Sequence, residues 1–127
     1  MIIGIGCDIV EHGITQKLEW QSDKEMLVRI FSQKELDLYN KQKTVKFISG
    51  RFAAKEAVLK CIGSGMYDGV SLTDIQIVQS KNGKPIVELK GEVKKISDKM
   101  QINFWHISIT HSISYSYAFV IAEGCES

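Results

Sequence analysis

The side chains best suited to chemistry stand on one long predicted helix, residues 44–62. Four of its residues follow one another at the spacing i, i+4, i+7 and i+11: Ser49, Ala53, Glu56 and Lys60. This spacing places them along one line of an α-helix, as a trough of small residues with a charged end. Because Glu four residues before Lys also favours an ordinary surface ion pair, the spacing alone leaves both interpretations open.

Two basic residues of the same helix, Arg51 and Lys55, stand one turn apart. Like charges at this spacing destabilise an isolated helix by roughly 0.2–0.5 kcal/mol. A bound anion such as a phosphate would compensate them, and two solvated side chains are the other interpretation. Arg51 lies about 140° around the helix from Glu56. If both residues act in one site, either the ligand is long or two subunits share the site.

A carboxylate, Asp8, follows the apolar segment 2–7, in which Gly4 and Gly6 alternate with larger residues. Glycines in a strand allow another backbone or a ligand to approach closely. Asp8 could cap a helix or bind a hard cation. Mg²⁺ is usually held by one or two carboxylates, with waters and phosphate oxygens completing its shell. Asp8 and Glu56 could form such a pair.

A predicted strand near the C-terminus carries hydroxyl and imidazole groups. Alternation places His106, Ser108 and Thr110 on one face of this strand. Such a face suits a phosphate-bearing ligand, although it could equally be an ordinary solvated face. His111 has the opposite parity to His106, which disfavours one metal ion bound by both. We interpret His12 as a surface residue.

Predicted strands and helices must position these groups. Their order along the chain predicts an α+β fold, with helices packed on a mainly antiparallel sheet. Ser32 with Glu35 is the signature of a helix capping box, and Asn82-Gly83 predicts the turn of a β-hairpin. A weakly helical region covers 13–30. The remaining elements are strands 2–7, 70–79, 86–90, 104–110 and 117–123, and helices 32–40, 44–62 and 91–100.

Composition narrows the class of protein. The 127 residues fit one domain, and 44% hydrophobic with 24% charged residues excludes a disordered tail or a coiled coil. A net charge of +1 offers no general footprint for nucleic acid. Three cysteines without CxxC spacing indicate reduced thiols. We expect a cytoplasmic protein, because the sequence has neither a signal peptide nor the roughly 18 apolar residues of a membrane span.

Three blocks in this order resemble the holo-acyl-carrier-protein synthases, the small bacterial 4′-phosphopantetheinyl transferases: Gly4–Glu11, Gly50–Lys60 and His106–His111. Together the blocks span nearly the whole chain, as a single domain over residues 1–127. The resemblance implies transfer of the phosphopantetheine arm of coenzyme A to a serine of an apo acyl carrier protein, with release of adenosine 3′,5′-bisphosphate. It also implies an α+β fold with one long central helix.

Carried over by motif position, Asp8 and Glu56 would hold Mg²⁺ against the diphosphate of coenzyme A, and Lys60 would add a point charge there. Either Glu56 or a metal-bound water would take the serine proton. An alternative function is a noncatalytic module of the same fold that binds coenzyme A or a nucleotide. The intact set of two carboxylates and a lysine argues against it, because binding alone needs no divalent cation over the scissile diphosphate.

The same resemblance implies which residues contact the nucleotide end of coenzyme A. Arg51 and His106 match residues that recognise the 3′-phosphate from a neighbouring subunit, and Thr110 and Asn82 are weaker candidates for polar contacts. The resemblance also implies a homotrimer with sites at the subunit interfaces. This agrees with the opposed directions of Arg51 and Glu56 on the helix.

One position departs from the family. Where the family usually has an arginine that meets the acidic carrier protein, this chain has Ile14. Docking of the carrier would then depend on Lys17, Lys24 or Arg29, or on apolar contact. The departure bears on the choice of partner and leaves the chemistry unchanged.

Overall fold

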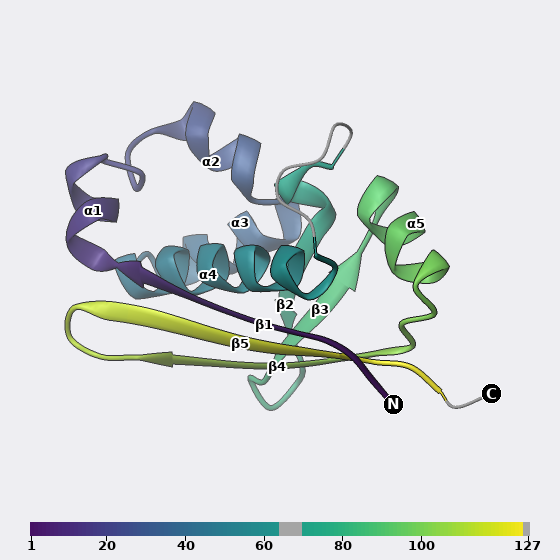
Figure 1. The fold of residues 1–127 in the computed structure, drawn as a ribbon. Coiled ribbons are helices and arrows are strands. Elements are labelled where there is room, and N and C mark those ends of the chain that lie inside the picture. The colour runs from purple at the N-terminus through teal and green to yellow at the C-terminus, as the bar shows by residue number, and fades with distance from the viewer. Residues whose placement is uncertain (64–69, 126–127) are drawn as a thin grey trace.

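The computed structural model describes residues 1–63 and 70–125 and confirms the α+β architecture. One long helix, α4, lies along a three-stranded antiparallel sheet, and helices α1, α2 and α3 lie on the other side of α4 (Figure 1). The helices are α1 His12–Lys17, α2 Lys24–Ile30, α3 Gln33–Lys41, α4 Val45–Cys61 and α5 Gly91–Lys99. The strands are β1 Ile2–Glu11, β2 Ile75–Gln79, β3 Pro85–Leu89, β4 Phe104–His111 and β5 Tyr115–Glu123.

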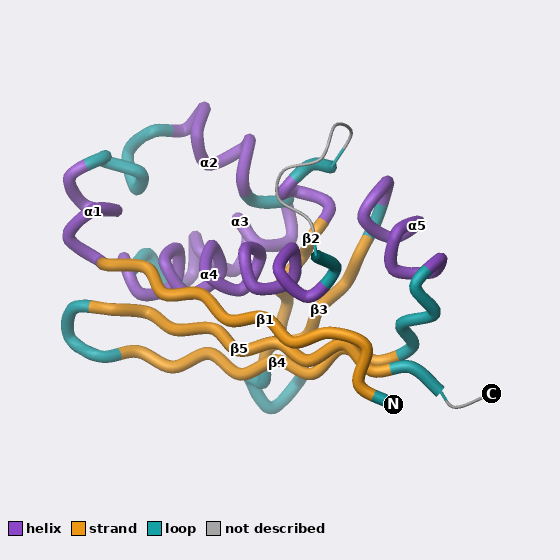
Figure 2. The backbone as a smooth tube through the Cα atoms, viewed as in Figure 1, coloured by secondary structure: helices purple, strands orange, loops and turns teal. Residues whose placement is uncertain are grey.

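The predicted elements are all present, but the weakly helical region 13–30 forms two separate helices, α1 and α2, and two strands differ from their predicted bounds by more than two residues. The first strand continues beyond residue 7 to Glu11, since Asp8 to Glu11 pair with β5. The expected strand over 70–79 begins only at Ile75, after a short 3₁₀ turn, η1 Leu72–Asp74. The strand traces in Figure 2 separate the sheet of order β1-β5-β4 from the β2–β3 hairpin.

Helix α4 forms the centre of the molecule. Thr44 caps its N-terminus by accepting a hydrogen bond from the backbone N–H of Phe47 at 3.1 Å, which satisfies one otherwise unpaired donor. Twelve of its 17 residues are buried, because the sheet covers one side of α4 and the other helices cover another. A helix enclosed in this way can hold side chains at fixed positions relative to the strands.

Strand β1 lies directly against α4, and its glycines make this contact possible. A Cβ atom added to Gly4 would collide with the backbone carbonyl oxygen of Cys61, and one added to Gly6 with that of Ala57. The sequence prediction of a close backbone approach is therefore confirmed. Because Asp8 follows Gly6 by two residues on the same face of the strand, this contact carries Asp8 to the C-terminal half of α4.

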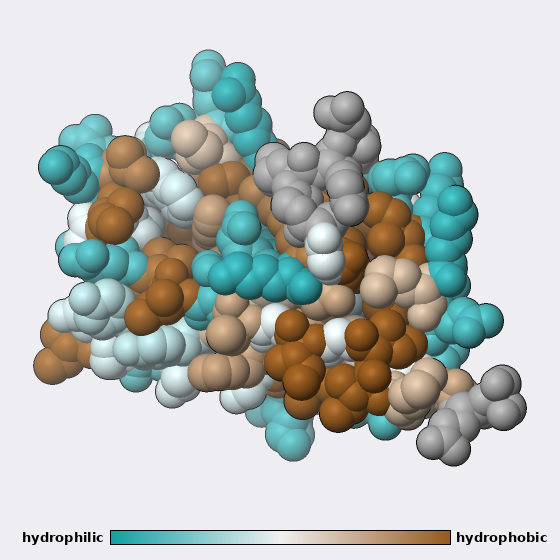
Figure 3. Space-filling model, in the orientation of Figure 1, coloured by the Kyte–Doolittle hydropathy of each residue, from teal (hydrophilic) through white to brown (hydrophobic). Residues whose placement is uncertain are grey.

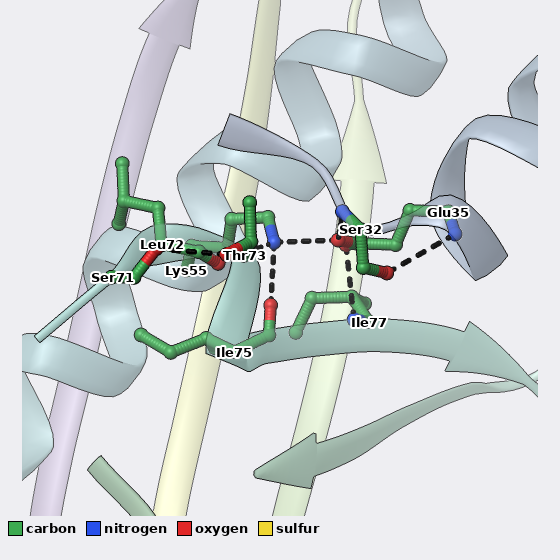
Figure 4. A network of polar contacts seen from close by, with 8 residues as sticks. All are labelled: Ser32, Glu35, Lys55, Ser71, Leu72, Thr73, Ile75 and Ile77. Carbon is green, nitrogen blue, oxygen red and sulfur yellow. Dashed lines mark hydrogen bonds and ion pairs between the residues drawn. The ribbon is translucent and has the colours of Figure 1, made fainter. Parts of the chain in front are cut away.

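A buried polar network joins four elements on the side of α4 away from the sheet (Figure 4). Ser32 and Glu35 form the predicted capping box of α3. Glu35 also accepts hydrogen bonds from the Lys55 ammonium at 2.6 Å and from the Ile77 backbone N–H at 3.1 Å. Lys55 donates further to the carbonyl oxygens of Leu72 and Ile75, at 2.8 and 2.5 Å. The network ties α3, α4, η1 and β2 together.

Candidate active site

Asp8 of β1 and Lys60 of α4 meet at the edge of the sheet. The Lys60 ammonium donates hydrogen bonds to Oδ1 of Asp8 at 3.1 Å and to the backbone carbonyl oxygen of Cys7 at 2.9 Å. Asp8 is largely covered, whereas the Lys60 side chain stays more than half exposed. The charged end of the predicted trough is thus not a plain ion pair within the helix, because its lysine bonds to the strand.

Glu56 lies one turn before Lys60 and shares the electrostatic environment of Asp8. Burial of Glu56 raises the pKa of its carboxyl group, the negative charge of Asp8 raises this pKa further, and Lys60 lowers it. The two carboxylates therefore repel each other, and one lysine neutralises only part of their charge. A divalent cation between them would relieve this repulsion.

Two hollows open at Asp8. One, of about 370 Å³, is lined by Asp8 and Glu56 together with the apolar side chains of Ile14, Trp20 and Phe52, among others. The other, of about 270 Å³, is lined by Cys7, Asp8, Ile9, Lys60, Tyr117 and Phe119. The carboxylates expected to converge thus line one cavity. The second hollow connects Asp8 and Lys60 with residues on the outer face of the sheet.

The donor set at this position fits a hard cation that keeps open coordination positions. Two carboxylates offer oxygen ligands of the kind that Mg²⁺ prefers. Among residues 1–63 and 70–125, no group of three His, Cys, Asp or Glu side chains could hold a metal ion by itself. A cation here would therefore need oxygen atoms from a substrate or from water to complete its shell.

Arg51 occupies a different side of α4 and is largely enclosed. Only 8% of the residue is exposed, and its guanidinium carbon lies 4.0 Å from the centre of the Phe47 ring. Its Nε atom has no hydrogen-bond partner in the part of the chain that the structure describes. Burial lowers the pKa of Arg51, and Glu35 opposes this shift. Arg51 is therefore not one of two freely solvated cations.

The position of Lys55 fits neither interpretation of the basic pair Arg51 and Lys55, a bound anion or two solvated side chains. Its side chain is completely buried, so it neither faces solvent nor presents its ammonium to a ligand. Burial lowers the pKa of Lys55, and the carboxylate of Glu35 opposes the shift. The compensating anion is thus a residue of the chain itself, 20 positions earlier in the sequence.

The imidazole that shares the electrostatic environment of Arg51 belongs to His111. A Cβ atom added to Gly50, the residue before Arg51 on α4, would lie 2.7 Å from Cε1 of His111. Burial lowers the pKa of His111, and the charges of His12, Lys46 and Arg51 lower it further. Sequence reasoning gave His111 no part in the site, although its strand parity matches that of the inward-facing residues of β4.

His12 is also buried, which shows that its interpretation as a surface residue is wrong. It is 4% exposed because the hairpin between β4 and β5 covers it. Its ring nitrogens lie 3.0 Å from the carbonyl oxygen of Ile113 and 2.7 Å from the hydroxyl of Ser116. These contacts span more than 100 positions in the sequence, so local patterning could not indicate them.

The other candidates for nucleotide contacts lie elsewhere. His106 and Thr110 point to the outer face of the sheet, away from α4. Nε2 of His106 is 2.8 Å from Oε1 of Glu123, and this hydrogen bond lowers the pKa of Glu123. Asn82 lies in the turn of the β2–β3 hairpin, where its side chain accepts a hydrogen bond from Ser80. One chain therefore does not bring these three residues to Asp8.

An exposed surface beside the larger hollow combines apolar and basic side chains. Ile14 and Leu18 are exposed at α1, and Val28 is exposed on α2. Three cations of the same region are exposed as well: Lys17, Lys24 and Arg29. Ile14 also lines the hollow that contains Asp8 and Glu56, so this surface leads into the candidate site.

The structure also describes the three cysteines and the lengths of the helices. Cys7, Cys61 and Cys125 are free thiols in the structure, in accord with the prediction of reduced cysteines. Within the described residues, each helix is too short or too polar to cross a membrane.

Comparison with known sequences gives matches along nearly the whole chain. Residues 4–119 match the family model of the 4′-phosphopantetheinyl transferase superfamily. The holo-[acyl-carrier-protein] synthase of Hydrogenovibrio crunogenus is 39% identical over 124 residues, covering 97% of this chain and 98% of the relative. That of a Geobacillus species is 42% identical over 126 residues, covering 97% and 98%.

Solved structures agree with the sequence matches. The holo-[acyl-carrier-protein] synthase of Neisseria meningitidis superposes with a TM-score of 0.88 at 31% identity, covering 97% of this chain and 99% of the other. The synthase of Bacillus anthracis, determined in complex with coenzyme A (3′,5′-ADP), gives a TM-score of 0.80 at 33% identity and covers 98% and 99%.

Proposed function

This chain belongs to the holo-[acyl-carrier-protein] synthases of the 4′-phosphopantetheinyl transferase superfamily, and we propose that its Asp8, Glu56 and Lys60 carry out the transfer with Mg²⁺. The enzyme moves 4′-phosphopantetheine from coenzyme A to a serine of apo acyl carrier protein and releases adenosine 3′,5′-bisphosphate. We propose that residues 1–127 act as one domain. The observation that supports this assignment best is the shared hollow of Asp8 and Glu56, which come from distant parts of the chain.

At the diphosphate, each of the three residues has a separate task. Asp8 and Glu56 would hold Mg²⁺, which when bound neutralises charge growing on the leaving phosphate. Lys60, already oriented toward Asp8 by its hydrogen bonds, presents its ammonium to the same diphosphate. The apolar walls of the hollow, Trp20 and Phe52, exclude water from the reacting groups and strengthen these charge interactions.

At the nucleotide end, Arg51 is proposed to bind the 3′-phosphate together with His111 and Lys46. Burial makes an unpaired guanidinium nitrogen costly, and a phosphate would supply the missing acceptor for Nε. His106, Thr110 and Asn82 remain proposed contacts of the nucleotide. His106 and Thr110 would act from the outer sheet face, toward a neighbouring subunit.

A shared site requires an assembly, which we propose to be a homotrimer. The part of the outer sheet face formed by β1 and β5 is largely apolar and open in the single chain, with Ile5, Ile9 and Phe119 exposed by 67%, 50% and 52%. An exposed apolar patch on a sheet commonly marks a protein interface. Because the smaller hollow joins Phe119 to Asp8 and Lys60, a second copy on this face would lie at the edge of the active site. Arg51 of one chain could then meet a ligand held by Asp8 of another.

The carrier protein is proposed to dock on α1 and α2. The exposed cations Lys17, Lys24 and Arg29 attract an acidic partner, while Ile14 and Val28 offer apolar contact. With Ile14 at the mouth of the hollow, part of the electrostatic attraction is replaced by burial of apolar surface. Association should therefore depend less on ionic strength than it would with an arginine at this position.

In the decisive experiment, the purified protein is incubated with apo acyl carrier protein, coenzyme A and Mg²⁺, and the mass of the carrier is then measured by mass spectrometry. The carrier should gain the mass of phosphopantetheine in the presence of Mg²⁺ and remain unmodified with EDTA. Asp8→Asn should abolish the gain while retaining the circular dichroism spectrum. Coenzyme A binding without any gain in carrier mass would overturn the enzymatic assignment in favour of the noncatalytic module.

A further inference from the structure

Two buried residues connect α1 to the imidazole of His111. The Ser116 hydroxyl lies 2.7 Å from Nδ1 of His111 and 2.7 Å from Nε2 of His12. Nδ1 of His12 in turn lies 3.0 Å from the carbonyl oxygen of Ile113. Ser116 is fully buried and His12 nearly so, which protects the hydrogen bond between these two residues from competing water, whereas the His111 side of the chain is open to solvent.

The direction of these hydrogen bonds follows from the acceptor at one end. A carbonyl oxygen can only accept, so Nδ1 of His12 must carry the hydrogen. In a neutral imidazole, Nε2 of His12 is then an acceptor, and the single proton of the Ser116 hydroxyl points to it. The Ser116 oxygen has a free lone pair on its other side, where it accepts from Nδ1–H of His111.

The remaining nitrogen of His111, Nε2, is consequently left with a lone pair. Three charged or titratable groups act on this ring: His12 of α1, and Lys46 and Arg51 of α4. From β5 the packed neighbour is the uncharged Ser116 hydroxyl. These surroundings and burial lower the pKa of His111, in agreement with a neutral ring in the free protein.

Arg51, Lys46 and His111 form the proposed phosphate cluster. A phosphate oxygen placed at this cluster would meet the two cations of α4 and a lone pair of His111. Two acceptors facing each other repel, and one proton between them turns the repulsion into a charge-assisted hydrogen bond. The phosphate monoester of coenzyme A is mostly a dianion above about pH 6, so at neutral pH this proton comes from solvent.

We propose that His12 and Ser116 are positioning residues that hold His111 with its hydrogen on Nδ1, so that binding of the 3′-phosphate of coenzyme A takes up one proton at Nε2. The inference rests on the proposed function, which places this phosphate at Arg51, Lys46 and His111. The added proton leaves Nε2–H pointing at the phosphate.

Uptake of a proton on binding fixes the direction in which affinity changes with pH. Affinity for coenzyme A falls as pH rises, by up to about tenfold per pH unit between the free and bound pKa values of the cluster. 3′-Dephospho-coenzyme A lacks the phosphate, and its affinity should be independent of this proton. The difference between the two ligands isolates the effect from titration of Glu56, which both ligands share.

Isothermal titration calorimetry in two buffers of different ionisation enthalpy counts the proton directly. We expect uptake of about one proton with coenzyme A and about none with the dephospho form. In Ser116→Ala, Nδ1 of His111 loses the hydroxyl that holds its hydrogen, so the ring is free to carry this hydrogen on Nε2 and proton uptake should fall. Ser49→Ala is the matched control, because this serine is equally buried but bonds to Thr15. It should retain the uptake.

A second variant and a ligand-free measurement guard against a misfolded Ser116→Ala. In His12→Phe, the Ser116 hydroxyl is free to donate to Nδ1 of His111, so uptake should also fall. Imidazole ¹⁵N chemical shifts of the free wild-type protein should show Nδ1 of His111 protonated. The opposite tautomer, or equal proton uptake with both ligands, would overturn the inference. Failure of coenzyme A to bind at all would instead overturn the proposed function, and the tautomer would still be read from the free protein.

Discussion

Nζ of Lys60 lies 3.1 Å from Oδ1 of Asp8, across the contact between α4 and β1. This pair is electrically neutral, and Glu56 adds one negative charge beside it. A divalent cation would change the sum over the three side chains from −1 to +1, which suits the diphosphate that we propose to bind here. The same arrangement gives Glu56 a protonation equilibrium that depends on both neighbours.

The pKa of Glu56 should respond in opposite directions to two substitutions. Asp8→Asn removes a neighbouring negative charge and should lower this pKa, whereas Lys60→Met removes a stabilising positive charge and should raise it. The pKa can be followed by NMR titration of the Glu56 carboxyl group in metal-free protein. A shift of the same sign in both variants would contradict the proposed geometry.

Because protons compete with the cation for Glu56, the Mg²⁺ concentration for half-maximal activity should rise as pH falls through this raised pKa. The increase should begin at a higher pH in Lys60→Met than in the wild type.

Gly6→Ala should damage both stability and activity. Its Cβ would collide with the Ala57 carbonyl oxygen, at a cost of about 1–3 kcal/mol, and would move Asp8 away from Lys60. Gly13→Ala is the control: its Cβ would meet only Oε1 of Glu11, at 3.5 Å, and alanine favours the helix by up to about 1 kcal/mol. Urea denaturation and the transfer assay measure the two effects. Wild-type behaviour of Gly6→Ala would show that the close contact is not needed.

The buried pair of Glu35 and Lys55 should behave as a unit. Lys55→Met leaves a buried carboxylate without its cation and should cost about 3–5 kcal/mol of unfolding free energy. The double variant Glu35→Gln/Lys55→Met should be more stable than Lys55→Met alone, because no charge remains buried. Lys94→Met, which removes an exposed pair with Asp98, should cost less than about 0.5 kcal/mol. Additive losses from the two buried positions would argue against coupling.

A charge on the outer sheet face should separate the subunits. Phe119→Lys introduces an ammonium among apolar residues, and sedimentation should show a shift from trimer to monomer with loss of transfer activity. Val28→Lys, at a similarly exposed apolar position on α2, should leave the assembly unchanged. An active monomer, or a wild type that sediments as a monomer, would refute the shared site.

Substitutions of His106 and His111, the two histidines of the third family block, should differ in their effect on the KM for coenzyme A. His111→Ala should raise the KM for coenzyme A, because His111 lies in the cluster with Arg51, and should leave the KM for 3′-dephospho-coenzyme A unchanged. His106→Ala should have the smaller effect, since Nε2 of His106 is already hydrogen-bonded to Glu123. A larger effect of His106→Ala would favour the assignment made from the motif.

Local patterns predicted the elements and the proximity of the two carboxylates that we propose as metal ligands. Helical periodicity aligned Glu56 with Lys60, the alternate Gly4 and Gly6 indicated a close backbone contact, and the capping box at Ser32 is present as expected. Each of these features acts over a few residues or through the absence of a side chain. Short-range geometry therefore determines them almost completely.

The partners of the buried polar groups depended on packing between distant segments. Lys55 meets Glu35 only because α3 and β2 close over α4, and His12 is buried only because the β4–β5 hairpin brings Ser116 and Ile113 against α1. A buried charge or imidazole must find a partner in space, and no periodicity of the sequence specifies which one. Residue type and spacing determined which groups could do chemistry, while the folded chain decided which of them line the candidate site and which stabilise the interior.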